Sequence, residues 1–205
     1  EFINLDDENI KDLDLLFNDL NLQYKDIEDG QVEIDKYHSL YLENFMSQSS
    51  LQFNRDQHFQ NLISHIEEKN HEDIQVPEHY KNILRDYQVQ GFQWLKTMSD
   101  YGFGGILADD MGLGKTLQVI TLLAHQKNME RGSSLIVVPR SLLFNWAAEI
   151  DKFCPSLSYI LYHGPFRLES QKRLMDFDLV ITTYDTASID IEFFKEKAFN
   201  YIILD

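Results

Sequence analysis

The chain has 205 residues, with 18 Lys and Arg against 34 Asp and Glu, so its formal net charge is −16. Hydrophobic residues make up 43% and aromatic residues 13% of the sequence, which is enough for a folded core and excludes general disorder. A single cysteine, Cys154, excludes an internal disulfide framework and a cysteine-rich zinc site. No apolar run approaches the ~20 residues that span a bilayer, and the first residues are not a signal peptide. We therefore expect a cytoplasmic protein without a membrane partner.

Charge divides the chain into two regions. Residues 1–80 hold 19 acidic and 5 basic residues, a net of −14, whereas residues 81–205 hold 15 and 13, a net of −2. The composition changes near Pro77, which interrupts a polar stretch and suits a domain boundary. We predict one domain over residues 1–76 and a second over residues 77–205. The acidic first domain repels phosphate backbones, so it is not expected to be a nucleic-acid surface.

The first domain is predicted to be mostly helical. Apolar residues recur at three- and four-residue spacing over residues 10–20, 37–45 and 59–66, which indicates three amphipathic helices. Gly30 ends the first pattern, and the alternation over residues 32–34 predicts a short strand.

The second domain alternates between short apolar runs and helical patterns. The predicted strands are residues 105–108, 134–138, 157–162, 179–181 and 201–204. The predicted helices are residues 115–127, 141–153 and 166–175, with a shorter one within residues 185–197. Apolar runs bracketed by helices are typical of a parallel sheet, because each parallel pair needs a crossover connection. The sequence therefore predicts an α/β domain with right-handed crossovers.

A phosphate-binding loop is predicted between the first strand and the first helix of this domain. Residues 108–116 read Ala-Asp-Asp-Met-Gly-Leu-Gly-Lys-Thr. Gly112 and Gly114 can adopt the backbone angles that turn several N–H groups toward one phosphate. Lys115 can reach the β- and γ-phosphates, and the Thr116 hydroxyl can hold Mg²⁺. The general pattern has Gly where Asp109 stands, so an ordinary glycine-rich connector is the alternative.

Several stretches in order resemble the Swi/Snf family of superfamily-two helicase-like ATPases, in which Asp at position 109 is usual. These stretches are residues 84–95, 104–118, 138–146, 162–164, 178–184 and 201–205. The resemblance covers residues 77–205, and residues 1–75 resemble the acidic associated segment of bacterial members. It implies an incomplete first RecA-like lobe, a parallel-sheet P-loop fold, preceded by a small and mainly helical acidic segment.

The resemblance also implies site residues. The implied nucleotide-binding residues are Gln88, Gly112, Leu113, Gly114, Lys115, Thr116 and Leu117. Gln88 would read the adenine edge, since a side-chain amide presents a donor and an acceptor together. Lys115 and Asp205 are the implied catalytic residues. Thr116 and Asp205 would hold Mg²⁺, Asp205 through a water molecule.

Contacts to nucleic acid would come from loops that follow the strands. The implied residues are Arg140, Ser141, His163, Thr182 and Thr183. N–H groups at helix starts bind backbone phosphates without reading sequence. Ser141 and Thr183 are equally suited to cap helices, and that alternative stays open here.

The resemblance implies a DNA-stimulated ATPase that uses ATP and Mg²⁺, moves on double-stranded DNA and remodels protein–DNA complexes. Its partners would be double-stranded DNA, bound weakly by this chain alone, and DNA-bound proteins such as a polymerase. We expect a monomer in the bacterial cytoplasm, associated with the nucleoid. The family has a catalytic glutamate after Asp205 and a second lobe, so this chain alone is expected not to hydrolyse ATP. The alternatives are a strand-separating superfamily-two helicase and a non-catalytic, nucleotide-responsive interaction module.

Overall fold

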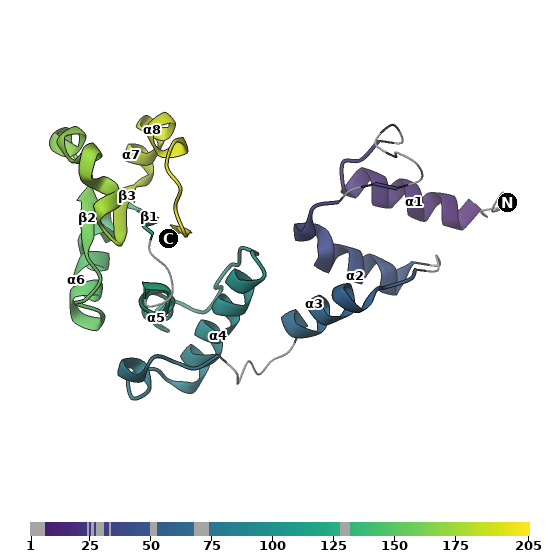
Figure 1. Cartoon of the computed structure of the whole chain (residues 1–205), viewed down its shortest axis with the longest axis horizontal. Helices are drawn as coiled ribbons and strands as arrows, with labels where there is room; N and C mark the ends of the chain where they lie inside the picture. Colours follow the sequence, from purple (N-terminus) through teal and green to yellow (C-terminus); the bar gives the residue numbers. More distant parts are fainter. Residues whose placement is uncertain are drawn as a thin grey trace. The chain divides into compact units, whose positions relative to one another are not determined.

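The computed structural model describes residues 7–23, 25, 27, 31–32, 34–49, 53–67, 74–127 and 132–205. The chain forms two compact units (Figure 1). Unit 1 contains residues 1–69 and 97–104, and unit 2 contains residues 70–96 and 105–205. The boundary near Pro77 stays a prediction. In the part of the chain that the structure describes, no helix has the length and apolar character needed to cross a membrane.

Unit 1 is helical. Its elements are α1 (Asp7–Asp19), the 3-10 helix η2 (Lys36–His38), α2 (Ser39–Gln48) and α3 (Gln57–Glu67). The three predicted helices are therefore confirmed. Leu16, Leu20 and Phe45 form a small buried core, and the Phe45 ring meets Phe53 edge to face at 6.1 Å.

The short strand predicted over residues 32–34 is wrong. Val32 and Ile34 lie outside any strand, and residues 30 and 33 lie outside the described residues. Two alternating apolar residues provide too few ladder hydrogen bonds to hold an isolated strand, which needs neighbours and a packed face.

The carboxyl end of helix α4 (Asp86–Asp100) belongs to unit 1, although the helix starts in unit 2. After α4, Gly102 adopts a positive φ of 70° beside Lys36, and the Phe103 ring meets Tyr37 edge to face at 6.0 Å. One continuous helix thus contributes residues to both units.

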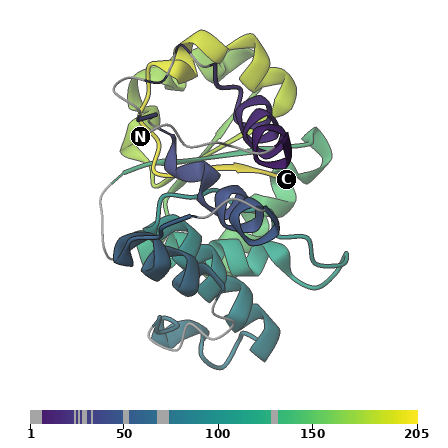
Figure 2. The same ribbon diagram turned by 90° about the vertical axis from the view of Figure 1, so that its right-hand side faces the viewer.

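Unit 2 contains a four-stranded parallel sheet with the order β2-β3-β1-β4. Its last strand is the yellow arrow near the C label in Figure 2. The strands are β1 (Ser134–Val138), β2 (Tyr159–Tyr162), β3 (Leu179–Thr183) and β4 (Ile202–Leu204). Helix α5 (Lys115–Lys127) precedes β1, whereas α6 (Leu143–Phe153) connects β1 to β2. Helices α7 (Tyr184–Ile189) and α8 (Ile191–Lys195) lie between β3 and β4. The 3-10 helices are η3 (Glu78–Tyr80), η4 (Arg140–Leu142) and η5 (Pro165–Asp176). The predicted fold class is confirmed.

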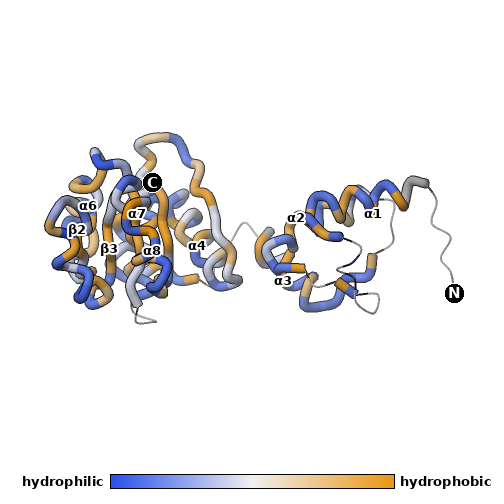
Figure 3. The backbone as a smooth tube through the Cα atoms, turned by 90° about the horizontal axis from the view of Figure 1, so that it is seen from above, coloured by the Kyte–Doolittle hydropathy of each residue, from blue (hydrophilic) through white to orange (hydrophobic). Residues whose placement is uncertain are grey.

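The central strands, β1 and β3, are buried at every position, which explains their mostly apolar sequences (Figure 3). Ile136 packs on one face with Ile120 of α5 and Ile150 of α6. Its neighbour Leu135 packs on the opposite face with Phe194 of α8. This alternation places α5 and α6 on one side of the sheet and α8 on the other.

The strand predicted over residues 105–108 is absent, so the described part of the chain has four strands in its sheet rather than five. Residues 103–110 have no regular structure, and Ile106 is 87% exposed. A strand requires a hydrogen-bonded neighbour, and no described strand pairs with this stretch. Gly104 and Gly105 weaken it further, because they add chain entropy without a side chain to pack.

Two predicted helices differ in kind. The segment predicted over residues 166–175 is the 3-10 helix η5, in which only Leu174 is buried, so no apolar stripe fixes an α-helical period. Where one shorter helix was predicted within residues 185–197, two short helices, α7 and α8, lie on either side of Asp190. The Asp190 carboxylate accepts hydrogen bonds from Arg167 Nε at 2.6 Å and from the Tyr162 hydroxyl at 2.9 Å.

Candidate nucleotide-binding site

The predicted phosphate loop has the backbone that phosphate binding requires. Gly112 and Gly114 have φ angles of 84° and 73°, in the left-handed region that favours glycine. Helix α5 starts directly afterwards, at Lys115. The free N–H groups of the first helical turn and the helix dipole favour an anion at this end.

The Lys115 side chain folds back over the loop. Its ammonium group donates hydrogen bonds to the main-chain oxygens of Asp109, at 2.7 Å, and Asp110, at 3.1 Å. Lys115 therefore does not extend into solvent as a lysine of an ordinary connector would. An ammonium group has three donors, so the third can meet a phosphate oxygen while the loop is held.

Gln88 and Tyr87 of α4 hold the other end of the loop. The Gln88 Nε2 atom and the Tyr87 hydroxyl both donate to the Leu113 oxygen, at 3.0 and 3.1 Å. Gln88 is buried, and its Oε1 accepts from the Arg85 N–H at 3.0 Å. The amide keeps one N–H and one lone pair beyond these bonds, which are the two groups that the adenine edge requires. Sequence reasoning missed Tyr87, although it directly precedes Gln88.

Gly114 is also required for close packing. A Cβ atom at this position would lie 2.5 Å from Gln88 Nε2, so a larger residue would displace the amide from the loop. Leu117 was also predicted to bind the nucleotide, but its side chain lies in the core cluster with Ile120. Leu117 can therefore face a nucleotide only through its main chain.

Asp205 follows β4, and its N–H donates to the Val137 oxygen at 3.0 Å, in line with the sheet. Its carboxylate accepts a hydrogen bond of 2.7 Å from the indole N–H of Trp146, a buried residue of α6. The Tyr184 hydroxyl donates to its main-chain oxygen at 3.0 Å. Burial raises the pKa of nearby Glu149, and the negative charge of Asp205 adds to this effect against the opposing charge of Lys152.

The donor set fits a magnesium ion in kind. Thr116 offers a hydroxyl in the first turn of α5, and Asp205 offers a carboxylate at the carboxyl end of a strand. Both are hard oxygen ligands of the type that Mg²⁺ prefers, and Mg²⁺ keeps several waters when few protein ligands are present.

Two of the predicted nucleic-acid residues, Arg140 and Ser141, are exposed in η4, after β1. Ser141 does not cap α6, whose N-cap is Leu142 without a side-chain bond. His163 follows β2, and its partly buried ring meets Phe144 edge to face at 6.0 Å. Because the strands are parallel, these loops all follow strand ends at the same edge of the sheet.

The hydroxyls of the two threonines have partners within the protein, and a phosphate contact through their main-chain N–H groups stays a prediction. Thr182 is fully buried, and its hydroxyl donates to the Tyr162 oxygen at 2.7 Å. Thr183 is the N-cap of α7, and its hydroxyl accepts from the Thr186 N–H at 3.3 Å. Thr182 is the last residue of β3 paired with β2, so its hydroxyl serves the sheet.

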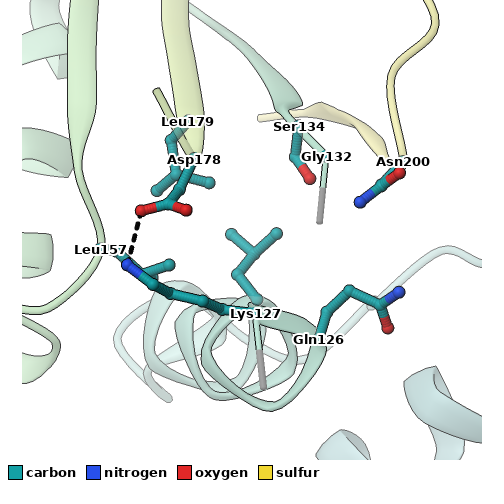
Figure 4. A pocket seen from close by; sticks show the side chains of 9 residues that line it. Gln126, Lys127, Gly132, Ser134, Leu157, Asp178, Leu179 and Asn200 are labelled. Carbon is teal, nitrogen blue, oxygen red and sulfur yellow. Dashed lines mark hydrogen bonds and ion pairs between the residues drawn. The ribbon is translucent and has the colours of Figure 1, made fainter. Parts of the chain in front are cut away.

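A separate pocket lies at the other end of α5 (Figure 4). It is lined by residues that include Lys127, Asp178 and Asn200, and the Lys127 ammonium lies 2.7 Å from an Asp178 carboxylate oxygen. With a rise of about 1.5 Å per residue, Lys127 is about 18 Å along α5 from Lys115. The pocket is therefore remote from the phosphate loop.

A parallel α/β fold with a glycine loop and a lysine at the start of a helix defines a P-loop nucleotide-binding protein. The family model described as SNF2-related domain matches residues 87–205, and the model described as bacterial SNF2 helicase associated matches residues 1–77. The chain therefore belongs to the SNF2 family, and the resemblance noted from its motifs is confirmed.

Similar proteins are found among curated sequences and solved structures. Helicase ssl-1 of Caenorhabditis elegans is 43% identical over 137 residues, 63% of this chain and 6% of that protein. The uncharacterized ATP-dependent helicase MG018 of Mycoplasma genitalium is 31% identical over 205 residues, 98% of this chain and 20% of that protein. The Sulfolobus solfataricus SWI2/SNF2 ATPase core in complex with dsDNA is 41% identical, with a TM-score of 0.58, over 64% of this chain and 28% of that chain.

Proposed function

We propose that this chain is the ATP-binding lobe, with its acidic associated segment, of a DNA-stimulated bacterial ATPase that moves on double-stranded DNA and remodels protein–DNA complexes. The observation that carries the proposal is the phosphate loop, which has two positive-φ glycines and is bonded by the ammonium of Lys115, the first residue of α5. The chain spans 28% of the solved ATPase core, so hydrolysis is proposed for the complete protein and not for this chain alone.

In the nucleotide complex, the N–H groups around Gly112 and Gly114 would bind phosphate oxygens, and the third donor of the Lys115 ammonium would meet the phosphates. Gln88 would bind the adenine edge with its remaining donor and acceptor. Thr116 and Asp205 would hold Mg²⁺, which would neutralise phosphate charge.

Double-stranded DNA is the proposed partner, because the 41% identical ATPase core was solved with dsDNA. Arg140 and the N–H groups near it would contact the backbone phosphates, which carry no sequence information. Since residues 81–205 have a net charge of only −2 and no basic excess, binding by this chain is expected to be weak and sensitive to salt.

The nucleotide part is tested by titrating the chain with a fluorescent ATP analogue. Lys115→Ala should lower the affinity at least about tenfold, as expected for loss of a charge-assisted bond worth about 1.5–3 kcal/mol. Lys172→Ala is the charge-matched control, because Lys172 is exposed in η5. Equal affinities for the parent chain and Lys115→Ala would contradict the proposal.

The DNA part is tested by measuring duplex binding at several salt concentrations. Arg140→Ala should weaken binding to all sequences alike and reduce the salt slope by about 1. Arg173→Ala, which removes an exposed arginine of η5, should have no such effect. An unchanged slope for Arg140→Ala would contradict a phosphate contact. Strand displacement by the complete protein would favour the strand-separating alternative.

A further inference from the structure

A buried glutamine of α5 lies next to the phosphate loop and has no role in the nucleotide contacts described above. Gln118 is fully buried one turn after Lys115. Its Nε2 donates a hydrogen bond of 3.0 Å to a carboxylate oxygen of Asp109. Its Oε1 is buried, and in the part of the chain that the structure describes it has no hydrogen-bond partner. A buried amide oxygen without a hydrogen bond costs free energy of folding. The presence of glutamine at this position therefore needs an explanation other than stability.

The Gln118 amide occupies a space that only glycine leaves open. A Cβ atom built on Gly91 of α4 would overlap Gln118 Oε1 and would lie 2.9 Å from its Cδ. Gly91 does not have a positive φ, so its requirement here is for close approach and not for backbone conformation. A side chain at position 91 would therefore displace the amide from the position in which it reaches Asp109.

Asp109 is placed where its charge can oppose nucleotide binding. Its main-chain oxygen is 2.7 Å from the Lys115 ammonium, so its own carboxylate is within side-chain reach of that ammonium. A carboxylate that paired with Lys115 would neutralise the charge that the phosphates need, and it would repel the phosphates as well. The hydrogen bond to Gln118 keeps one carboxylate oxygen on the α5 side.

We propose that Gln118 is a positioning residue of the phosphate loop, which holds the Asp109 carboxylate away from the Lys115 ammonium, and that Gly91 is required to make room for its amide. The proposal rests on the proposed function, in which Lys115 binds ATP phosphates. Gln118 of α5 and Gly91 of α4 thus act together to position the Asp109 carboxylate.

The test is a double-mutant cycle on ATP affinity. Gln118→Met keeps the side-chain volume and removes the donor, and it should lower the affinity about tenfold, as for the loss of a hydrogen bond to a charged group. In the Asp109→Asn background, where no carboxylate can pair with Lys115, Gln118→Met should change the affinity less than about twofold. Gly91→Ala should lower the affinity through the same carboxylate and should also lose its effect in that background.

The outcomes separate the two proposals. If Lys115→Ala leaves ATP affinity unchanged, the proposed function fails. If Lys115→Ala lowers ATP affinity but Gln118→Met does not, the positioning role is overturned. It is also overturned if Gln118→Met lowers ATP affinity by the same factor in the parent chain and in the Asp109→Asn background. A merely structural role of Gln118 would not depend on the charge at position 109. The comparison of the Gln118→Met effect with and without Asp109→Asn therefore distinguishes positioning from structure. Should Gly91→Ala fail to fold, as judged by its unfolding transition, the Gln118→Met cycle alone decides.

Discussion

The indole N–H of Trp146 donates a 2.7 Å hydrogen bond to the carboxylate of Asp205. Trp146 is buried in α6 and packs in the same core cluster as Leu117 of α5. One side chain therefore belongs to the core that also buries α5 and bonds directly to the carboxylate proposed to hold Mg²⁺. Because the bond occupies one carboxylate oxygen, it fixes the direction of the other.

Trp146→Phe should raise the Mg²⁺ concentration that is needed to support ATP binding. Phenylalanine keeps most of the apolar packing but removes the donor, so the carboxylate loses its fixed orientation. Loss of such a partner typically reduces metal affinity about tenfold or more. The measurement is a Mg²⁺ titration at fixed ATP. Trp94→Phe removes the chain's other indole and is the control; the same Mg²⁺ dependence for both variants would contradict the orienting role.

Gly114→Ala should be more damaging than Gly112→Ala. Both residues have positive φ, so alanine costs about 1–2 kcal/mol of stability at each. At Gly112 an added Cβ meets no atom within 4 Å, whereas at Gly114 it lies 2.5 Å from Gln88 Nε2. Gly114→Ala should therefore lose ATP affinity in addition to stability. Denaturant unfolding and ATP titration of the two variants measure the difference, and equal effects would contradict the packing argument.

Asp178→Asn should make the stability of unit 2 less dependent on acid. Burial raises the pKa of Asp178, but hydrogen bonds from Lys127 and from Ser158 outweigh it and hold the pKa below its usual value. Because the folded-state pKa is lowered, the carboxylate stabilises the fold above the unfolded-state pKa of about 3.9 and loses this contribution as the pH falls below that value.

Accordingly, Asp178→Asn should lower the free energy of unfolding by about 1–3 kcal/mol at pH 7, and the difference from the parent chain should shrink below about pH 4. Denaturant unfolding over a pH series provides the measurement. Asp176→Asn is the matched control, since its pair with Arg173 is exposed and such pairs contribute at most about 1 kcal/mol. A pH-independent difference for Asp178→Asn would show that the charge is not involved.

Phe45→Ala should destabilise unit 1 selectively. The side chain is buried with Leu16 and Leu20, and removal of a buried phenylalanine costs about 3–5 kcal/mol. Amide hydrogen exchange should show loss of protection in α1 and α2 but not in β1 and β3, because the two groups of elements lie in different compact units. Leu15→Ala is the control, since Leu15 is 52% exposed on α1. Equal loss in β1 and β3 would contradict independent cores.

The buried strands were predictable because burial on both faces requires a run of mostly apolar residues, which is visible in the local sequence. Residues 134–138 were predicted as a strand and form β1, with every residue buried. The stretch of residues 105–108 has a similar apolar content but no strand, because a strand depends on a partner that its own sequence does not specify. Helix α5 was predicted with its observed bounds, since a glycine precedes it and its apolar spacing continues to the end.

The site was predictable where one short motif supplies the geometry. The positive φ angles of Gly112 and Gly114 follow from such a motif. The bonds from Tyr87 to Leu113 and from Trp146 to Asp205 join residues 26 and 59 positions apart, so they depend on how the elements pack. The burial of Thr182 depends on where β3 ends and on its pairing with β2, and local sequence leaves that end uncertain by a few residues.

Because residues 97–104 belong to unit 1, shortening the chain so that it begins at Pro77 would remove only part of that unit. Such a deletion would take away Tyr37 and Lys36, which contact Phe103 and lie beside Gly102, and it would expose apolar surface at the end of the helix. The first turn of the same helix, α4, carries Tyr87 and Gln88, which donate hydrogen bonds to the phosphate loop. An exchange of unit 1 between relatives therefore has to include residues 97–104.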